Sequence, residues 1–122
     1  MTAIIPAILT ESFEDLRRQI RRVDGLFPFV HLDVMDGEFV RKKSFFEVEK
    51  IPGIGTSLQY ELHLMVNSPL TEMKKWQHTP NVSRVIIHRE SPASVEECRA
   101  FAKAHSWEFG MALNPDTPLE VA

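Results

Sequence analysis

The sequence predicts an α/β fold with a parallel sheet, of the (β/α)8 barrel type, here with about five strands and four helices, the first part of an incomplete barrel. Two observations predict it. Short apolar runs alternate with helical patterns, which is typical of βαβ units. Two of these runs also carry ionisable residues on one face only, as expected for strands that line a barrel interior. A flavodoxin-like five-stranded parallel sheet is the alternative.

The apolar runs are the expected strands. Each has the length of an ordinary strand, and no stretch reaches the roughly 18 apolar residues that a membrane span needs. The runs cover residues 4–9, 29–35, 61–66, 84–88 and 108–113.

The first helix is expected directly after the first strand. Thr10 or Ser12 is a suitable N-cap for it. Its apolar residues recur at helical spacing and share one face; they are Phe13, Leu16, Ile20 and Val23.

Three further helices are expected. Ser68 and Pro69 supply an N-cap and a first helical residue, and Ser94 with Glu97 forms a capping box. A helix over residues 45–50 should be short, because the breakers Pro52, Gly53 and Gly55 follow it.

The faces of the second and third strands distinguish the two architectures. Side chains alternate across a strand, so each of these strands has one aliphatic face and one mixed face. A doubly wound sheet should be aliphatic on both faces, because helices cover both. A barrel meets its helices on the outer face only, and the pattern therefore favours a barrel. Residues expected on its inner face also include Ile5, Leu9, Ile86, Met111 and Leu113.

Three ionisable residues should converge on that inner face. His31 and Asp33 project from one strand, and His63 projects from the next. Two imidazoles and a carboxylate at one point suit a divalent metal ion, although each histidine could instead be a hydrogen-bonded core residue. Asp36 falls on the opposite face and, with Gly37, indicates a turn.

Three motifs carry a resemblance to a known family. They are "HLDVMDGEF" at 31–39, "ELHLMV" at 61–66 and "ALNPDTPLE" at 112–120. In this order and spacing they resemble the ribulose-phosphate 3-epimerase family, from "IIPAIL" at 4–9 to the last residue. The resemblance implies a (β/α)8 barrel that interconverts D-ribulose 5-phosphate and D-xylulose 5-phosphate.

The resemblance also implies roles for individual residues. A divalent metal ion, zinc first and iron, manganese or cobalt as alternatives, would be held by His31, Asp33 and His63. Asp33 would be one of two catalytic carboxylates that transfer a proton on opposite faces of C3. The metal would stabilise the enediolate between the two transfers. His63, Met35 and Met65 would contact the substrate.

The chain departs from the family pattern in several places. Ala7 stands where the family usually has a serine, and Arg41 and Lys42 stand where it usually has proline and asparagine. The second catalytic aspartate and the glycine-rich phosphate loops have no counterpart in the sequence. Glu61 and Asp116 are the only conceivable substitutes for that aspartate, and neither is well placed.

Three functions therefore stay open. The chain contributes half of an epimerase site, or it is a catalytically silent half-barrel that binds a metal or a partner, or it belongs to an epimerase for another ketose phosphate. Thr117, Pro118 and Glu120 form a helix start signal next to the last residue. We therefore expect that the chain stops short of its natural end and is inactive alone.

Composition restricts the partners. The net charge of −3 argues against a nucleic-acid partner. The single cysteine suits a reducing cytoplasm, and the N-terminus lacks the features of a signal peptide. We expect one domain over residues 1–122, a sugar phosphate as small-molecule partner, no membrane partner, and homo-oligomers formed through open sheet edges.

Overall fold

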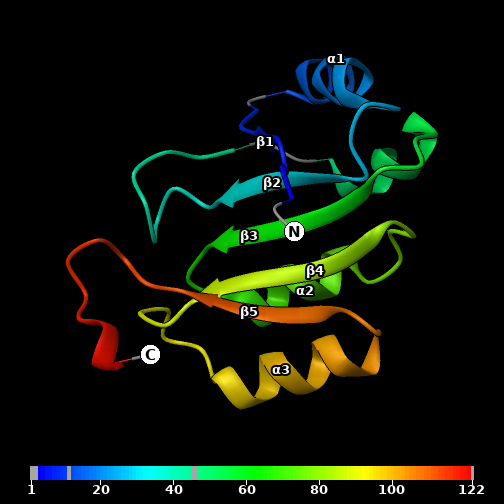
Figure 1. The fold of residues 1–122 in the computed structure, drawn as a ribbon. Helices are drawn as coiled ribbons and strands as arrows, with labels where there is room; N and C mark the ends of the chain where they lie inside the picture. Colours follow the sequence, from blue (N-terminus) through cyan, green and yellow to red (C-terminus); the bar gives the residue numbers. More distant parts are fainter. Residues whose placement is uncertain (1–2, 11, 45–46, 122) are drawn as a thin grey trace.

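The strands form one parallel sheet in chain order. A computed structural model describes residues 3–10, 12–44 and 47–121. Its sheet has the order β1-β2-β3-β4-β5, and the strands lie side by side in that sequence (Figure 1). A flavodoxin-like sheet has the order 2-1-3-4-5, so that alternative is wrong. The strands are β1 (Ala7–Ile8), β2 (Phe29–Met35), β3 (Gln59–Met65), β4 (Val82–His88) and β5 (Glu108–Ala112).

Helices connect these strands, as the alternating pattern predicts. The connecting helices are α1 (Phe13–Val23), η1 (Val48–Ile54), α2 (Pro69–Trp76) and α3 (Val95–Ala104), and η2 (Leu119–Val121) follows β5. Ser12 caps α1 by accepting the N–H of Asp15 at 3.1 Å, and Ser94 caps α3 by accepting the N–H of Glu97 at 3.3 Å. Ser68 makes no such side-chain bond to α2. Among the described residues, no helix is long and apolar enough to cross a bilayer.

The segment η1 differs from the expectation of a short helix over 45–50. Residues 45 and 46 lie outside the described residues, and the 3-10 helix of η1 runs through Pro52 and Gly53. Proline fixes a φ that a 3-10 helix also uses, so it interrupts one hydrogen bond without stopping the turn. The helix ends at Gly55, whose φ of 70° lies in the left-handed region that favours glycine.

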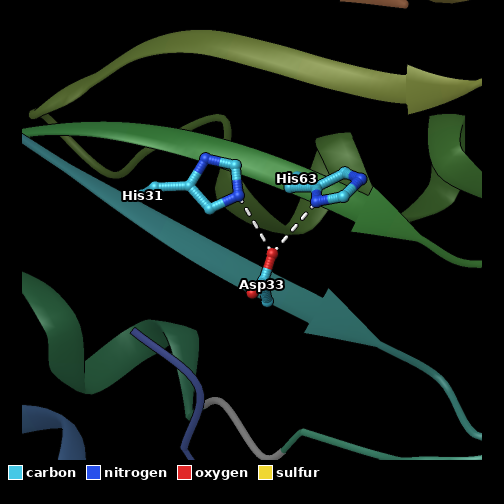
Figure 2. A group of neighbouring side chains, drawn as sticks. All are labelled: His31, Asp33 and His63. Atoms are coloured by element: carbon cyan, nitrogen blue, oxygen red, sulfur yellow. Dashed lines mark hydrogen bonds and ion pairs between the residues drawn. The ribbon is translucent and has the colours of Figure 1, made fainter. Parts of the chain in front are cut away.

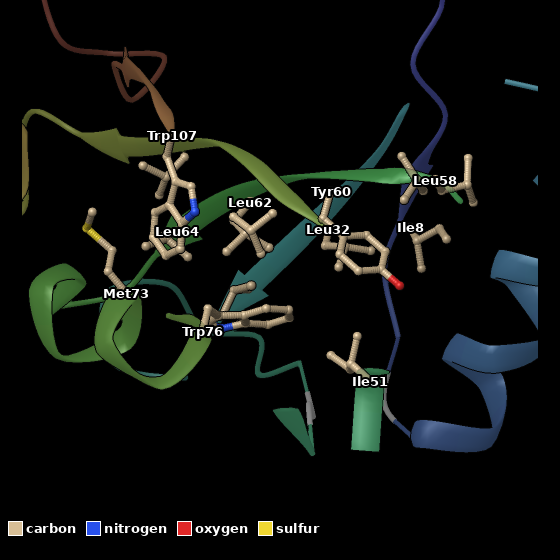
Figure 3. Close-up of a cluster of buried hydrophobic side chains, with 14 of the residues drawn as sticks. Ile8, Leu32, Ile51, Leu58, Tyr60, Leu62, Leu64, Met73, Trp76 and Trp107 are labelled. Atoms are coloured by element: carbon tan, nitrogen blue, oxygen red, sulfur yellow. The ribbon is translucent and has the colours of Figure 1, made fainter. Parts of the chain in front are cut away.

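The core lies on the helix-covered outer face of the sheet. Leu32, Leu62 and Leu64 are each 0% exposed there. Figure 3 shows Leu62 and Leu64 close to Met73 and Trp76 of α2. Burying aliphatic side chains against a helix removes apolar area from water, which is the main force that holds this layer.

The inner face of the sheet has no helix layer in the described chain, and most of its side chains are only partly covered. Ile86 lies on this face, because it pairs in register with His63. The expectation for Met111 is wrong, since Met111 pairs with Ile87 on the outer face and Gly110 takes the inner position. Leu9 follows the two-residue β1 and is 47% exposed, so the first strand is shorter than the apolar run over 4–9.

Candidate metal centre

The strand register brings the predicted residues together. In the parallel pair β2–β3, Asp33 lies beside His63, His31 beside Glu61, and Met35 beside Met65. All of them alternate with the buried aliphatic residues of the same strands, so they share the inner face. Asp33 and His63 lie toward the C-terminal ends of their strands, where the functional residues of barrel enzymes gather.

His31 and His63 both turn one ring nitrogen toward the carboxylate of Asp33 (Figure 2). The distances to Asp33 Oδ1 are 3.0 Å from His31 Nε2 and 3.0 Å from His63 Nδ1. One ligand atom from each of the three residues lies within 4.8 Å of the other two. Their side chains are 19% to 24% exposed, so the cluster is accessible from the inner face.

Asp33 remains a carboxylate in this setting. Burial alone would raise its pKa, but the hydrogen bonds from His31 and His63 outweigh burial and lower the pKa well below its usual value. A carboxylate has no proton to donate, so both imidazoles donate N–H groups to it in the metal-free protein. Asp33 is therefore an anionic oxygen donor with two imidazoles beside it.

A second carboxylate, that of Glu61, contacts the ring nitrogen of His31 that points away from Asp33. His31 Nδ1 lies 2.5 Å from Glu61 Oε1, and Arg84 Nη1 lies 2.6 Å from the other oxygen of Glu61. Arg84 also bonds the exposed Glu108 at 2.9 Å. The hydrogen bond to Asp33, together with the one to Glu61, raises the pKa of His31 against the opposing effect of burial. Burial would raise the pKa of Glu61, but its bonds to His31 and Arg84 lower it.

His88 also lies at this centre, although the sequence did not lead us to predict it there. It ends β4, is 8% exposed, and its ring stacks on that of His63 at a centroid distance of 4.9 Å and an angle of 14°. The two Nε2 atoms lie 2.7 Å apart. The sequence did contain a signal for His88. Arg84, Ile86 and His88 are spaced two residues apart, so they share one face of their strand, just as His31 and Asp33 do.

The third motif connects to His88 through Glu90. Glu90 Oε1 lies 3.7 Å from His88 Nδ1, and Glu90 Oε2 accepts the backbone N–H of Asn114 at 2.9 Å. The pKa of Glu90 is lowered, and the largest cause is its hydrogen bond with Thr117. Where a helix start was predicted at Thr117, the structure has a single 3-10 turn, η2, which begins only at Leu119. Asp116 is exposed in the preceding turn, away from the cluster's carboxylate.

The two methionines lie beside the cluster as expected from their spacing. Met35 is 8% exposed, its N–H donates to Ser44 Oγ at 2.8 Å, and Met65 is its register neighbour. Asp36 has the turn role predicted for it, because its Oδ1 accepts the N–H groups of Glu38 and Phe39 at 2.8 Å. Gly37 follows with a φ of 80°.

The three donors fit a divalent cation. Neutral imidazole nitrogen and carboxylate oxygen are ligands that zinc, iron, manganese and cobalt share, and three protein ligands leave positions open for a substrate. A cation at this point would take the place of the two protons that the histidines now direct at Asp33. The residues present therefore fit a catalytic type of metal site, in which coordination is not filled by protein alone.

Comparison with known proteins assigns the chain to a family. The model of the "Ribulose-phosphate 3 epimerase family" matches residues 3–122. The chain is 31% identical over 98 residues to the ribulose-phosphate 3-epimerase of Chlamydia pneumoniae. This alignment covers 75% of this chain and 40% of that protein. It is 34% identical over 95 residues to the one of Encephalitozoon cuniculi, with coverage of 76% and 43%.

The match to the Bacillus subtilis ribulose-phosphate 3-epimerase is longer, with 28% identity over 124 residues that cover 99% of this chain and 56% of that protein. The chain thus spans about half the length of the curated relatives it matches. The family match extends over nearly all of the chain, and the consecutive parallel strands agree with part of a barrel of this type. The chain therefore belongs to the ribulose-phosphate 3-epimerase family.

Proposed function

We propose that this chain carries the metal-binding half of an active site that interconverts D-ribulose 5-phosphate and D-xylulose 5-phosphate. The observation that carries the proposal is the convergence of His31, Asp33 and His63 on the inner face of an epimerase-family sheet. His31, Asp33 and His63 would hold zinc or a similar divalent cation, whose positive charge would stabilise negative charge that develops on the substrate. We also propose that residues 1–122 form a single domain, which is the N-terminal part of the barrel.

Asp33 is the proton-transferring residue in this proposal. Its low pKa keeps it ionised at neutral pH, so it is ready to accept a proton from C3. His63 and the neighbouring Met35 and Met65 lie on the same inner face, where they contact the substrate. The methionines exclude water from one side of the reacting carbon, which strengthens every charge interaction there.

Inversion at C3 needs a second acid–base group on the opposite face of the carbon. Glu61, the nearest further carboxylate described around the cluster, has one oxygen on His31 and the other on Arg84. It is 7% exposed and therefore poorly placed to meet a substrate. We propose that the 122-residue chain by itself binds metal and abstracts a proton, but does not complete the epimerisation.

Deuterium incorporation tests this proposal. Ribulose 5-phosphate is incubated with the zinc-loaded protein in D₂O, and C3 is followed by NMR. Exchange without xylulose 5-phosphate is expected, and Asp33→Asn should abolish it. Asp116→Asn is the matched control, because Asp116 is an exposed turn residue. Complete conversion by the chain, or exchange that survives in Asp33→Asn, would contradict the assigned role.

A metal-binding half-barrel without turnover is the second candidate. The observation that favours it is that Asp33 alone among the described carboxylates belongs to the three-residue cluster. Zinc binding with no exchange at C3 would support it over the epimerase. Exchange with a different ketose phosphate, tested in the same assay, would indicate an epimerase-like enzyme with another substrate.

Phosphate binding should be weak in this chain. Arg41, Lys42 and Lys43 are exposed in the loop that follows β2, and each solvent-screened contact contributes at most about 1 kcal/mol. We therefore propose millimolar affinity for ribulose 5-phosphate. Calorimetry that gives a micromolar Kd would contradict this. The buried free thiol of Cys98 fits a reducing compartment, and we propose the cytoplasm.

The open edges of the sheet lead us to propose a homo-oligomer. In the described chain, β1 pairs only with β2 and β5 pairs only with β4. An unpaired edge presents backbone N–H and C=O groups to a second chain. Light scattering coupled to size exclusion should show a mass above that of the 14.0 kDa chain, with a concentration dependence. A monomer at all concentrations would contradict it.

A further inference from the structure

Each histidine of the cluster has a polar partner on its second ring nitrogen. His31 directs Nε2 at Asp33 and Nδ1 at Glu61, at 3.0 Å and 2.5 Å. His63 directs Nδ1 at Asp33 and Nε2 at His88, at 3.0 Å and 2.7 Å. The two rings are thus held at both ends, and neither outer partner belongs to the three-residue cluster itself.

The outer partner of His31 is a hydrogen-bond acceptor. A histidine that binds a metal through one nitrogen keeps its proton on the other, and the partner of that N–H fixes the tautomer and the ring plane. Glu61 is a carboxylate and can only accept, so it holds the proton of His31 on Nδ1. Arg84 bonds the second oxygen of Glu61, and Arg84 is itself held by Glu108, so the acceptor is fixed in place.

The outer partner of His63, which is His88, is also a hydrogen-bond acceptor, but the reason is less direct. Of two Nε2 atoms at 2.7 Å, one must donate and the other accept. His88 Nδ1 and Glu90 Oε1 are both buried and face each other at 3.7 Å. A carboxylate next to that nitrogen favours a proton on His88 Nδ1, which leaves Nε2 of His88 as the acceptor. Stacking on His63, and the ring of Phe39 at 5.3 Å, hold the plane of His88.

We propose that Glu61 and His88 are positioning residues of the metal centre. Glu61 holds the N–H at Nδ1 of His31, and His88 holds the N–H at Nε2 of His63. The nitrogens that face Asp33 are then the ones that give up their protons to a metal ion. The inference rests on the proposed metal function of the cluster, and it extends the site from β2 and β3 to β4.

The tautomers can be observed directly. Long-range proton–nitrogen NMR spectra of the zinc-loaded protein at pH 8 should show His63 protonated on Nε2, and His88 protonated on Nδ1 and unprotonated on Nε2. His31 should carry a proton on Nδ1. A proton on Nε2 of His88 would make it the donor to His63 and would overturn its role as an acceptor.

Metal affinity gives the second readout. Zinc calorimetry on Glu61→Ala and on His88→Phe should show binding weakened by about 10- to 100-fold, as is typical for lost outer partners of metal ligands. Gln retains an amide oxygen that accepts, so Glu61→Gln and His88→Gln should lose less. Glu108→Gln is the matched control, because it removes only the charge of an exposed residue that contacts Arg84 and leaves the contact between Arg84 and Glu61 in place. The thermal unfolding of each variant identifies any that fails to fold.

The outcomes separate this inference from the proposed function. If the wild-type protein does not bind zinc, the proposed function is wrong and the positioning role fails with it. If the wild-type protein binds zinc, and His63→Ala does not, the metal centre holds. Unchanged zinc affinity in folded Glu61→Ala and His88→Phe would then contradict the positioning role alone.

Discussion

Replacing His63 by alanine should abolish the metal centre and destabilise the metal-free protein. The substitution removes one of the three proposed ligands, which leaves His31 and Asp33 as an incomplete site. It also removes a hydrogen bond to the ionised Asp33 and one to the imidazole of His88. Bonds to charged groups contribute about 1.5–3 kcal/mol and neutral ones about 0.5–1.5 kcal/mol, so we expect a loss of roughly 2–4 kcal/mol.

Thermal unfolding with and without zinc measures both effects. In a domain of this size 1 kcal/mol corresponds to a Tm change of roughly 4 °C, so the metal-free variant should melt roughly 8–16 °C below the wild-type protein. Zinc at one hundred times its Kd adds about 2.7 kcal/mol to a protein that binds it only when folded. Zinc should therefore raise the Tm of the wild-type protein by about 10 °C and leave His63→Ala unchanged.

The matched control is His78→Ala. His78 is exposed after α2 and does not belong to the cluster, so this variant should retain the zinc-dependent rise in Tm. An equal rise in His63→Ala and in the wild-type protein would show that zinc binds elsewhere, and the ligand assignment would be refuted.

Three further predictions concern stability. Leu62→Ala in the centre of β3, where the side chain is 0% exposed, should cost about 2–5 kcal/mol by denaturant unfolding; a loss equal to that of the exposed Leu26→Ala would refute the core assignment. Burial raises the pKa of Glu72, so its contribution to stability is present at low pH and is lost as pH rises through that pKa. Glu72→Gln should therefore have a higher Tm than the wild-type protein at pH 7, with a smaller difference at pH 4; a lower Tm at pH 7 would contradict this. Burial would raise the pKa of Asp36, but backbone N–H groups, that of Asn67 first, lower it below 3.8. Its stabilisation is present above pH 3.8 and is lost as pH falls through the lowered pKa, and Asp36→Asn should lessen this loss in acid unfolding curves.

Local patterns in the sequence were sufficient to bring the three proposed ligands together. Alternation along two strands placed His31, Asp33 and His63 on one face opposite the leucines, because successive side chains of any strand point to opposite sides. The same rule applied to 84–88 would have found His88 as well. Turn and capping signals were also local, and those at Asp36, Ser12 and Ser94 are confirmed.

Other features depended on which strands pair and in what register. The expected inner position of Met111 was wrong because β5 has apolar residues on both faces, and alternation alone does not say which face meets the helices. Only the pairing of Met111 with Ile87 settles that. The contact between Glu61 and His31 likewise depends on the β2–β3 register, since a shift of one residue would turn Glu61 away.

By itself, then, the sequence determined the α/β class, the two strand faces and the three converging side chains. These follow from periodicities that each segment carries within its own residues. The tertiary structure decided the strand order, the outer hydrogen-bond partners of His31 and His63, and the link from Glu90 to Asn114. Those contacts join residues 24 to 30 positions apart, and only the packing of whole strands against each other fixes them.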